Sequence, residues 1–224
     1  MASKTSLKNK RVLITSGPTW VAIDDVRVIS NKSTGRLGQL LAKHCLKDGA
    51  KVTLIEGPVT KPADEKKIRT IKFCYYEEFY KILKSELKKS YDVVIHAAAV
   101  SDYKLKNPFK KKISSRLKKL SLQLIPTEKI ISVIKKINPK AFLVGFKLES
   151  TVTRSNIKKL TSDLFAKAHC DLVVANSSKN NKYCGFIVDK KLNIAAQANS
   201  RKEMSKKLCV SLRLYSSPQQ GEAG

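Results

Sequence analysis

Acidic residues are scarce in this sequence. Its 224 residues include 18 Asp and Glu against 45 Lys and Arg, a formal net charge of +27. Such a chain prefers anionic partners, and nucleic acid, an acidic membrane surface and phosphate-bearing small molecules all meet that description. With 42% apolar and 28% charged residues, the composition excludes a wholly disordered or collagen-like chain and favours one large domain with a buried core.

The sequence also lacks long apolar runs. Its most apolar stretch, 93–100, is interrupted by His96, whereas a membrane span needs about 20 apolar residues. The basic N-terminus is followed by no apolar signal region, as a secreted protein would need. We therefore expect a cytoplasmic protein with no membrane partner.

No Cys-x-x-Cys pair is present. The five cysteines are odd in number, which favours reduced thiols over a disulfide framework. We predict no metal site, and the simpler interpretation of each cysteine is a small buried apolar residue.

Strand-like and helix-like segments alternate along the chain, without an internal repeat. Period-2 or continuous apolar runs predict strands, and 3.6-residue spacing predicts helices. The expected strands are 11–15, 51–55, 92–99, 141–146 and 171–175, and the expected helices are 35–47, 76–89 and 155–168. This βαβ series predicts an α/β fold with a doubly wound, mostly parallel, Rossmann-like sheet. A C-terminal hairpin over 186–195 and a closing helix over 201–212 complete it.

One segment interrupts this alternation. Residues 104–119 carry eight basic side chains and no acidic one, and 120–124 then alternates apolar and polar residues like a strand exposed on one side. A long basic loop inside a compact domain is usually functional, as a flap over a ligand, an arm to a partner subunit, or both. We expect an N-terminal extension at 1–9, one domain at 10–214 with a flap or dimerisation segment at about 103–126, and a disordered tail at 215–224.

The turn after the first strand is a candidate phosphate site. It contains Gly17 but not Gly-x-Gly-x-x-Gly, so the ordinary dinucleotide fingerprint is missing. The next helix begins near Ser33, Thr34 and Gly35, where a hydroxyl can cap it and free N–H groups attract phosphate. A capped helix without a ligand explains the same residues equally well.

Three further segments carry candidate groups. Arg27 offers a planar fork to carboxylate or phosphate, although on the surface it would more simply pair with Asp24 or Asp25. Asn31 offers both a donor and an acceptor beside the turn. Ala98 and Ala99 leave room for a flat ring, with Asp102 beyond them to accept hydrogen bonds. Tight packing and a capping aspartate explain that last segment too, and His96 is more simply a core residue.

Two other positions are weaker by themselves. Lys112 lies on the basic loop, where a lysine can offset the charge of a reacting phosphate, but nothing in the run distinguishes it from its neighbours. Phe146 follows a predicted strand and is placed to stack on a base.

Together these segments resemble the phosphopantothenate–cysteine ligase family, also called phosphopantothenoylcysteine synthetase. They occur in the family's order and spacing over about residues 10–212, and the matching runs are 25–35, 98–103, 112–115, 145–149 and 171–176. The chain lacks a flavin-binding decarboxylase half, so it resembles the stand-alone bacterial form.

The resemblance implies a ligase of coenzyme A biosynthesis. It would join 4′-phosphopantothenate to cysteine through an acyl-nucleotidylate, with CTP favoured over ATP and Mg²⁺ accompanying the nucleotide. The catalytic residues would be Asn31 and Lys112, and Arg27 and Asn31 would bind substrate. The nucleotide-binding residues would be Gly17, Ser33, Gly35, Ala98, Ala99, Asp102, Lys112, Phe146 and Lys167. A homodimer joined through the flap region is also implied.

Two positions depart from the family pattern. Pro18 stands where the family usually has part of a Gly-Gly-Thr turn, so one backbone N–H is lost. Glu128 replaces a proline after the flap and adds a negative charge near the nucleotide.

Two other classes of function compete with the ligase. A nicotinamide-dependent reductase would need the missing glycine fingerprint and a Tyr-x-x-x-Lys pair, whose spacing only Tyr80 and Lys84 satisfy. A nucleic-acid-binding module would use the basic face, but aromatic residues are not interleaved with the basic run as a stacking platform requires. We expect only non-specific contact with nucleic acid.

Overall fold

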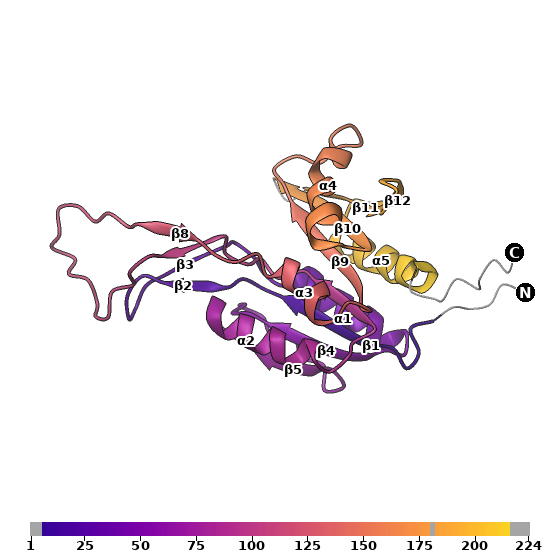
Figure 1. Ribbon diagram of the computed structural model, residues 1–224, viewed down its shortest axis with the longest axis horizontal. Helices are drawn as coiled ribbons and strands as arrows, with labels where there is room; N and C mark the ends of the chain where they lie inside the picture. Colours follow the sequence, from indigo (N-terminus) through magenta and orange to yellow (C-terminus); the bar gives the residue numbers. More distant parts are fainter. Residues whose placement is uncertain (1–5, 180–181, 216–224) are drawn as a thin grey trace, which may run out of the picture.

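An eight-stranded sheet forms the centre of the computed structural model, which describes residues 6–179 and 182–215 (Figure 1). Its strand order is β12-β11-β10-β9-β6-β1-β4-β5. The six strands from β10 to β5 are parallel, and β11 and β12 are antiparallel. The bounds are β1 Arg11–Ser16, β4 Lys51–Glu56, β5 Arg69–Lys72, β6 Val93–His96, β9 Phe142–Leu148, β10 Leu172–Lys179, β11 Lys182–Asp189 and β12 Ile194–Ala198.

This order places a reversal of winding between β1 and β6. The chain moves outward from β1 through β4 to β5, and then returns to the other side of β1 to add β6, β9 and β10. In open α/β sheets, ligands bind at the carboxyl ends of the strands beside such a reversal. The doubly wound, mostly parallel sheet and the C-terminal hairpin predicted from the sequence are therefore confirmed.

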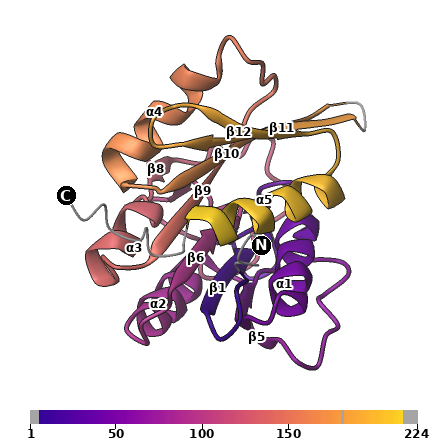
Figure 2. The ribbon, with the colours of Figure 1, turned by 90° about the vertical axis from the view of Figure 1, so that its right-hand side faces the viewer.

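Helices cover both faces of the sheet (Figure 2). Alternate residues of β1 explain the two layers, because Val12 and Ile14 pack in one apolar core and Leu13 packs in the other. The first core includes buried residues of α1 and α5, and the second includes those of α2, α3 and the end of α4. The bounds are α1 Arg36–Lys47, α2 Tyr76–Leu87, α3 Ile131–Ile137, α4 Ile157–Ala168 and α5 Arg201–Tyr215.

Two short ribbons project from the sheet on one side (Figure 1). One pairs β2 with β3, the other pairs β7 with β8, and β2 lies beside β7. Their bounds are β2 Trp20–Ala22, β3 Val28–Ser30, β7 Tyr103–Leu105 and β8 Leu124–Pro126. The basic segment 106–119 lies in the connection between β7 and β8, which we call the arm (residues 106–123).

The prediction of a strand over 120–124 is wrong, because β8 begins only at Leu124. Its partner β7 has three residues, and one further bond, from the N–H of Lys106 to the carbonyl of Gln123 (3.0 Å), ends the pairing. Leu120 is 44% exposed, so neither pairing nor burial holds this stretch as a strand. β5 and α3 are short elements that the sequence analysis did not predict.

The chain ends differ in how far they are described. Leu7 falls in the predicted N-terminal extension, yet it is buried in the core, and its N–H donates to Asp48 (3.3 Å). The tail predicted at 215–224 lies outside the described residues from position 216 onward. Three cysteines, Cys45, Cys170 and Cys209, are buried as small core residues, whereas the other two are half-buried.

A buried carboxylate joins α2 to the sheet. Glu86 accepts hydrogen bonds from the Arg69 guanidinium (2.7 and 3.0 Å), Lys89 (2.7 Å) and the Tyr91 hydroxyl (2.7 Å). Burial by itself raises the pKa of Glu86, but these donors outweigh it and lower the pKa to about 2. The ionised form is therefore stabilised in the folded state.

We expect Glu86→Gln to lower the free energy of unfolding by about 2 kcal/mol near neutral pH, because a buried charge-assisted network is broken. The folded pKa lies below the ordinary value of 4.5, so this contribution is present above 4.5 and is lost as the pH falls toward 2. Urea unfolding across that range should show the native and variant proteins converging. Glu77→Gln, which removes an exposed ion pair with Lys104, is the control and should cost less than about 1 kcal/mol. A constant gap at all pH values would contradict the assignment.

Candidate active site

Two chain segments continue side by side beyond the carboxyl ends of β1 and β6. The N–H of Ala97 donates to the carbonyl of Thr15 (3.2 Å), and the N–H of Ala99 donates to that of Gly17 (2.9 Å). Farther out, the N–H of Thr19 donates back to Ala99 (3.3 Å). This backbone pairing holds the Gly17 turn against Ala98 and Ala99, at the edge where the winding reverses.

The start of α1 packs directly against the end of β1. Gly35 precedes the helix with φ +68°, and its carbonyl accepts a hydrogen bond from the Ser16 hydroxyl (2.8 Å). A Cβ on Gly38 would lie 2.5 Å from that same hydroxyl oxygen, so only glycine permits this close approach. The first turn holds no acidic residue, which leaves a helix N-terminus suited to an anion beside Gly17.

Ser33 and Gly17 complete this corner. The hydroxyl of Ser33 accepts a hydrogen bond from the N–H of Gly35 (3.4 Å), and no side chain caps the helix itself. Gly17 has φ +78°, which a larger residue adopts only with strain. The sequence-predicted residues Gly17, Ser33 and Gly35 are therefore brought together.

Asn31 connects this corner to β6. Its side-chain amide nitrogen donates to the carbonyls of Ala99 and Val100, both at 3.1 Å. These bonds use the amide donors, so the side-chain oxygen is the group that remains for a ligand. Asn31 thus joins Ala98 and Ala99 at the same edge of the sheet.

Asp24 ties the tip of the β2–β3 ribbon to the arm. This carboxylate is 5% exposed and accepts hydrogen bonds from the N–H of Ile113 (3.0 Å) and from the N–H groups of Val26 (2.9 Å) and Arg27 (2.8 Å). The hydrogen bond from the Ile113 N–H lowers the pKa of Asp24 more than any other interaction does, whereas burial raises it. The other donors add to the lowering and bring the pKa to about 2. Asp24 is therefore an anion over the whole physiological range.

Arg27 takes part in the same junction. Its Nη1 donates to Asp24 (2.6 Å) and to the carbonyl of Ile113 (3.1 Å), so it makes the pairing with Asp24 that the sequence analysis gave as the simpler alternative. Its side chain is still 38% exposed. The structure thus places Arg27 at the ribbon tip, whereas Asn31 lies at the ribbon base after β3.

Lys112 is exposed on the arm, next to the buried Ile113. Hydrogen bonds hold the arm on both sides of it, from the N–H of Phe109 to the carbonyl of Ile23 (2.9 Å) and from the N–H of Ile113 to Asp24. Lys112 is therefore presented at the ribbon tip with Arg27, and it is not in the corner formed by Gly17, Gly35 and Asn31.

The remaining predicted residues lie in different places. Asp102 is exposed and paired with Lys129. Phe146 is on β9, the strand next to β6, and is half-buried toward the α1 and α5 side of the sheet. Lys167 lies in the last turn of α4, where it pairs with Asp163 (3.1 Å), toward the amino ends of the strands. The structure does not bring Lys167 to the corner.

The two departures from the family pattern have definite surroundings. Pro18 bridges to Ala99 within the paired segments. The carboxylate of Glu128 accepts a hydrogen bond from the Tyr80 hydroxyl (2.9 Å), and its carbonyl accepts one from Tyr76 (2.8 Å). Burial and then the Glu128 charge raise the pKa of Tyr76 to about 12. The Glu128 charge is thus held against α2.

His96 is a core residue, as the sequence predicts. It is 7% exposed, and its Nδ1 lies 3.0 Å from the Thr15 hydroxyl. Burial lowers the pKa of His96 to about 4, so the ring is neutral near pH 7.

The reductase alternative does not fit this edge. In dinucleotide-binding domains the second strand supplies a carboxylate to the ribose. The corresponding Glu56 is buried and is already bonded to Gln39 (2.9 Å) and to the N–H of Ala63 (3.0 Å). The bond to Glu128 raises the pKa of Tyr80, whereas a catalytic tyrosine needs a lowered one.

Two further structural findings concern the helices and the metal-ligating side chains of the described residues. Within residues 6–179 and 182–215, no helix has the length and hydropathy needed to cross a bilayer. The same residues contain no group of three or more His, Cys, Asp or Glu side chains placed to hold a metal ion.

The fold and this corner define a doubly wound α/β domain with a helix N-terminus suited to an anion at its topological reversal. Comparison with known proteins gives the family. Residues 7–216 match the family described as DNA/pantothenate metabolism flavoprotein C-terminal domain, and the chain belongs to that family.

Relatives of known name support this assignment. The chain is 41% identical over 178 residues to the coenzyme A biosynthesis bifunctional protein CoaBC of Thermococcus kodakarensis, covering 78% of this chain and 43% of that protein. It is 33% identical over 214 residues to the protein of the same name from Haemophilus influenzae, covering 94% and 51%. The chain thus spans about half the length of these relatives.

A solved structure shows the same fold. The DNA/pantothenate metabolism flavoprotein from Streptococcus pneumoniae superimposes with a TM-score of 0.81 at 28% identity, covering 92% of this chain and 99% of that one.

Sequence reasoning missed the role of Asp24 as the anchor of the arm. A signal was present, since an Asp followed by two or three turn residues often binds their N–H groups. Its bond to Ile113, 89 positions away, has no local signal.

We expect Asp24→Asn to release the arm without unfolding the sheet, because it replaces the charged acceptor that holds the arm. Trypsin should then cut after Lys110, Lys111 or Lys112 about tenfold faster. Asp25→Asn, at an exposed neighbouring position, is the matched control and should leave the rate unchanged. Equal cleavage of both variants would refute the anchoring role.

Proposed function

We propose that this domain joins 4′-phosphopantothenate to cysteine in coenzyme A biosynthesis, through an acyl-nucleotidylate. The observation that carries the proposal is the corner at the reversal of winding, where a free helix N-terminus, two small-residue segments and the Asn31 side chain meet. The relatives named coenzyme A biosynthesis bifunctional protein support the pathway.

In the first step, the carboxylate of 4′-phosphopantothenate attacks the α-phosphorus of a nucleoside triphosphate. A new O–P bond forms, the bond to the β-phosphate oxygen breaks, and pyrophosphate leaves. The N–H groups at the start of α1, with Gly17 and Ser33, suit the phosphates. Ala98 and Ala99 leave room for the base, and Asp102 and Phe146 border it. Lys167 is given no role in this step, because it lies toward the amino ends of the strands, away from the corner.

Lys112 supplies a positive charge to this step. Charge builds on the α-phosphate and on the leaving pyrophosphate, and a cation placed there lowers the barrier. Because Lys112 lies at the ribbon tip, it reaches a nucleotide in the corner only if the arm closes, or if the arm of a partner subunit supplies it.

In the second step, the amine of cysteine attacks the acyl carbon. The C–N bond forms, the nucleoside monophosphate leaves with the electron pair of the broken C–O bond, and the amine loses a proton. Asn31 is held by two backbone carbonyls, so its side-chain oxygen has a fixed direction for positioning the intermediate. Arg27 is proposed to bind the substrate, 4′-phosphopantothenate.

The nucleotide is proposed to be CTP rather than ATP. Magnesium would accompany it, because Mg²⁺ is usually held by substrate phosphates with one or two carboxylates. Asp102 at this edge would supply a carboxylate once it leaves its ion pair with Lys129. The ion would neutralise phosphate charge.

Pyrophosphate release tests the first step. With Mg²⁺ and CTP or ATP, release should depend on 4′-phosphopantothenate, and Lys112→Ala should slow it about 100-fold because the transition-state charge loses its cation. Lys110→Ala, two positions away on the same arm, is the control and should retain activity. No release with either nucleotide would reject the proposal.

Asn31→Asp separates the two steps in the same assay. It should still release about one equivalent of pyrophosphate per site and form little amide, since the intermediate is made but not positioned for cysteine. Loss of both products together would assign Asn31 to the first step instead.

We also propose a homodimer joined through the arm. Leu117, Leu120 and Leu124 are 54%, 44% and 43% exposed, and apolar side chains on one projecting segment favour burial against a second copy. Light scattering should give twice the chain mass for the native protein. Leu117→Asp with Leu120→Asp should give the monomer mass, whereas Val210→Asp, at a 49% exposed position on α5, should not. A native monomer would exclude this interface.

A further inference from the structure

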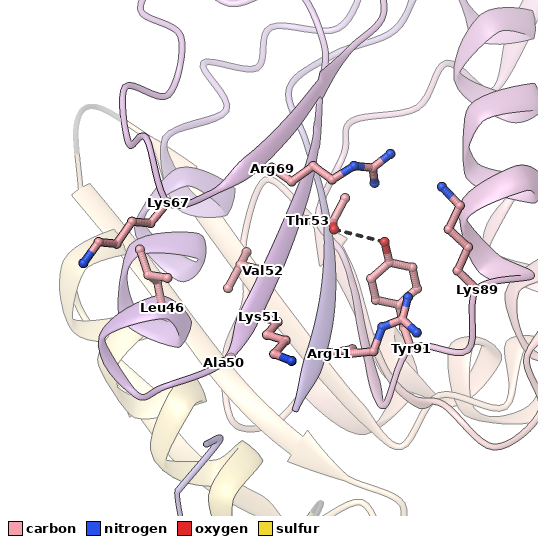
Figure 3. A pocket seen from close by; sticks show the side chains of 10 residues that line it. All are labelled: Arg11, Leu46, Ala50, Lys51, Val52, Thr53, Lys67, Arg69, Lys89 and Tyr91. Atoms are coloured by element: carbon pink, nitrogen blue, oxygen red, sulfur yellow. Dashed lines mark hydrogen bonds between the residues drawn. The ribbon is translucent and has the colours of Figure 1, made fainter. Parts of the chain in front are cut away.

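A basic groove lies at the amino ends of β1, β4 and β5, the opposite end of the sheet from the candidate site (Figure 3). Its volume is about 530 Å³, within the range of small-molecule sites. The residues that line it are Arg11, Leu46, Ala50, Lys51, Val52, Thr53, Lys67, Arg69, Lys89 and Tyr91.

The groove is richer in positive charge than the chain as a whole. Five of its ten lining residues are Lys or Arg and none is acidic, whereas 45 of the 224 residues of the chain are basic. The general excess of lysine therefore does not account for this concentration.

The strand register places two of these cations next to each other. Arg11 and Lys51 are direct partners on β1 and β4, and adjacent strands are only about 4.8 Å apart. Like charges placed opposite each other on a sheet are destabilising. Figure 3 shows Arg11 and Lys51 between Lys67 on one side and Lys89 on the other.

Nearby carboxylates neutralise only part of this charge. Glu86 forms ion pairs with Arg69 and Lys89, and Asp92 forms one with Lys10 at 3.5 Å. The Arg11 guanidinium lies 5.1 Å from the centre of the Tyr91 ring. In the part of the chain that the structure describes, no ion pair is formed by the side chains of Arg11, Lys51 and Lys67. Three positive side chains in the groove thus form no ion pair with a carboxylate, although Asp92 accepts a hydrogen bond from the backbone N–H of Arg11 (2.7 Å).

The groove is separate from the candidate active site. Arg11 begins β1, and Ser16 ends it beside the start of α1. The five residue steps from Arg11 to Ser16 separate the two ends by about 16 Å, so one small ligand does not occupy both places.

We propose that this groove is a second binding site, for a small molecule that carries two or more phosphate groups. Phosphate oxygens would neutralise the Arg11, Lys51 and Lys67 side chains and relieve the repulsion between the first two. The half-buried Leu46 would contact the rest of the ligand, because Tyr91 and Val52 are almost fully buried. The assignment is independent of the reaction proposed for the other edge.

Inorganic tripolyphosphate is a suitable probe, titrated into ¹⁵N-labelled protein at about 0.15 M salt to screen diffuse attraction. The backbone N–H signals of Val12, Val52 and Thr53 should shift saturably. In the double variant Arg11→Gln, Lys51→Gln the apparent Kd for these shifts should rise about tenfold. The charge-preserving double variant Arg11→Lys, Lys51→Arg should keep the native response.

Lys158→Gln with Lys159→Gln, on the exposed side of α4, is the matched control for loss of charge and should bind as the native protein does. Signals at Gly17, Gly35 and Ala98 report phosphate at the candidate active site separately. Shifts confined to those three would overturn the second site. Weak shifts spread over the whole surface and reduced equally in both Gln variants would also overturn it, because they would reflect net charge alone.

Discussion

The candidate site depends on the pairing of β1 and β6 beyond the edge of the sheet. At and beyond the ends of these two strands, the segments 15–19 and 97–99 form backbone hydrogen bonds with each other. Their backbone groups are therefore paired as in a strand, although the segments are irregular. The start of α1 is fixed to the same place through Ser16, and Asn31 is fixed through the carbonyls of Ala99 and Val100. The corner is therefore built from main chain and small side chains before any ligand arrives.

A second anchor organises the projecting ribbons. Asp24 is almost fully buried and remains ionised because four donors face it. The arm is thereby attached to the ribbon tip, while the corner is at the ribbon base. The two regions that carry Lys112 and Asn31 are held by different interactions.

Most of the fold could be predicted from the sequence, because buried parallel strands such as 93–96 and 172–175 are nearly continuous apolar runs. Short elements could not: β5 has four residues and β2 three, too few for a period to be visible. The strand expected over 120–124 had the right alternation, but its pairing reaches only Gln123 and Leu124. In the site, glycine positions such as Gly17 and Gly35 were predictable from local chemistry. The sequence could not predict the partner of Arg27 or the position of Lys112 at the ribbon tip. Both depend on contacts with Ile113, which is distant in sequence from the ribbon.

The attachment of the arm also has an entropic consequence. The bond between Lys106 and Gln123 closes the loop, and the bonds at Phe109 and Ile113 already order its first half. Fixing one residue costs roughly 1–2 kcal/mol of backbone entropy. Folding has therefore met part of that cost around Phe109 and Ile113 before any ligand or partner contacts the arm.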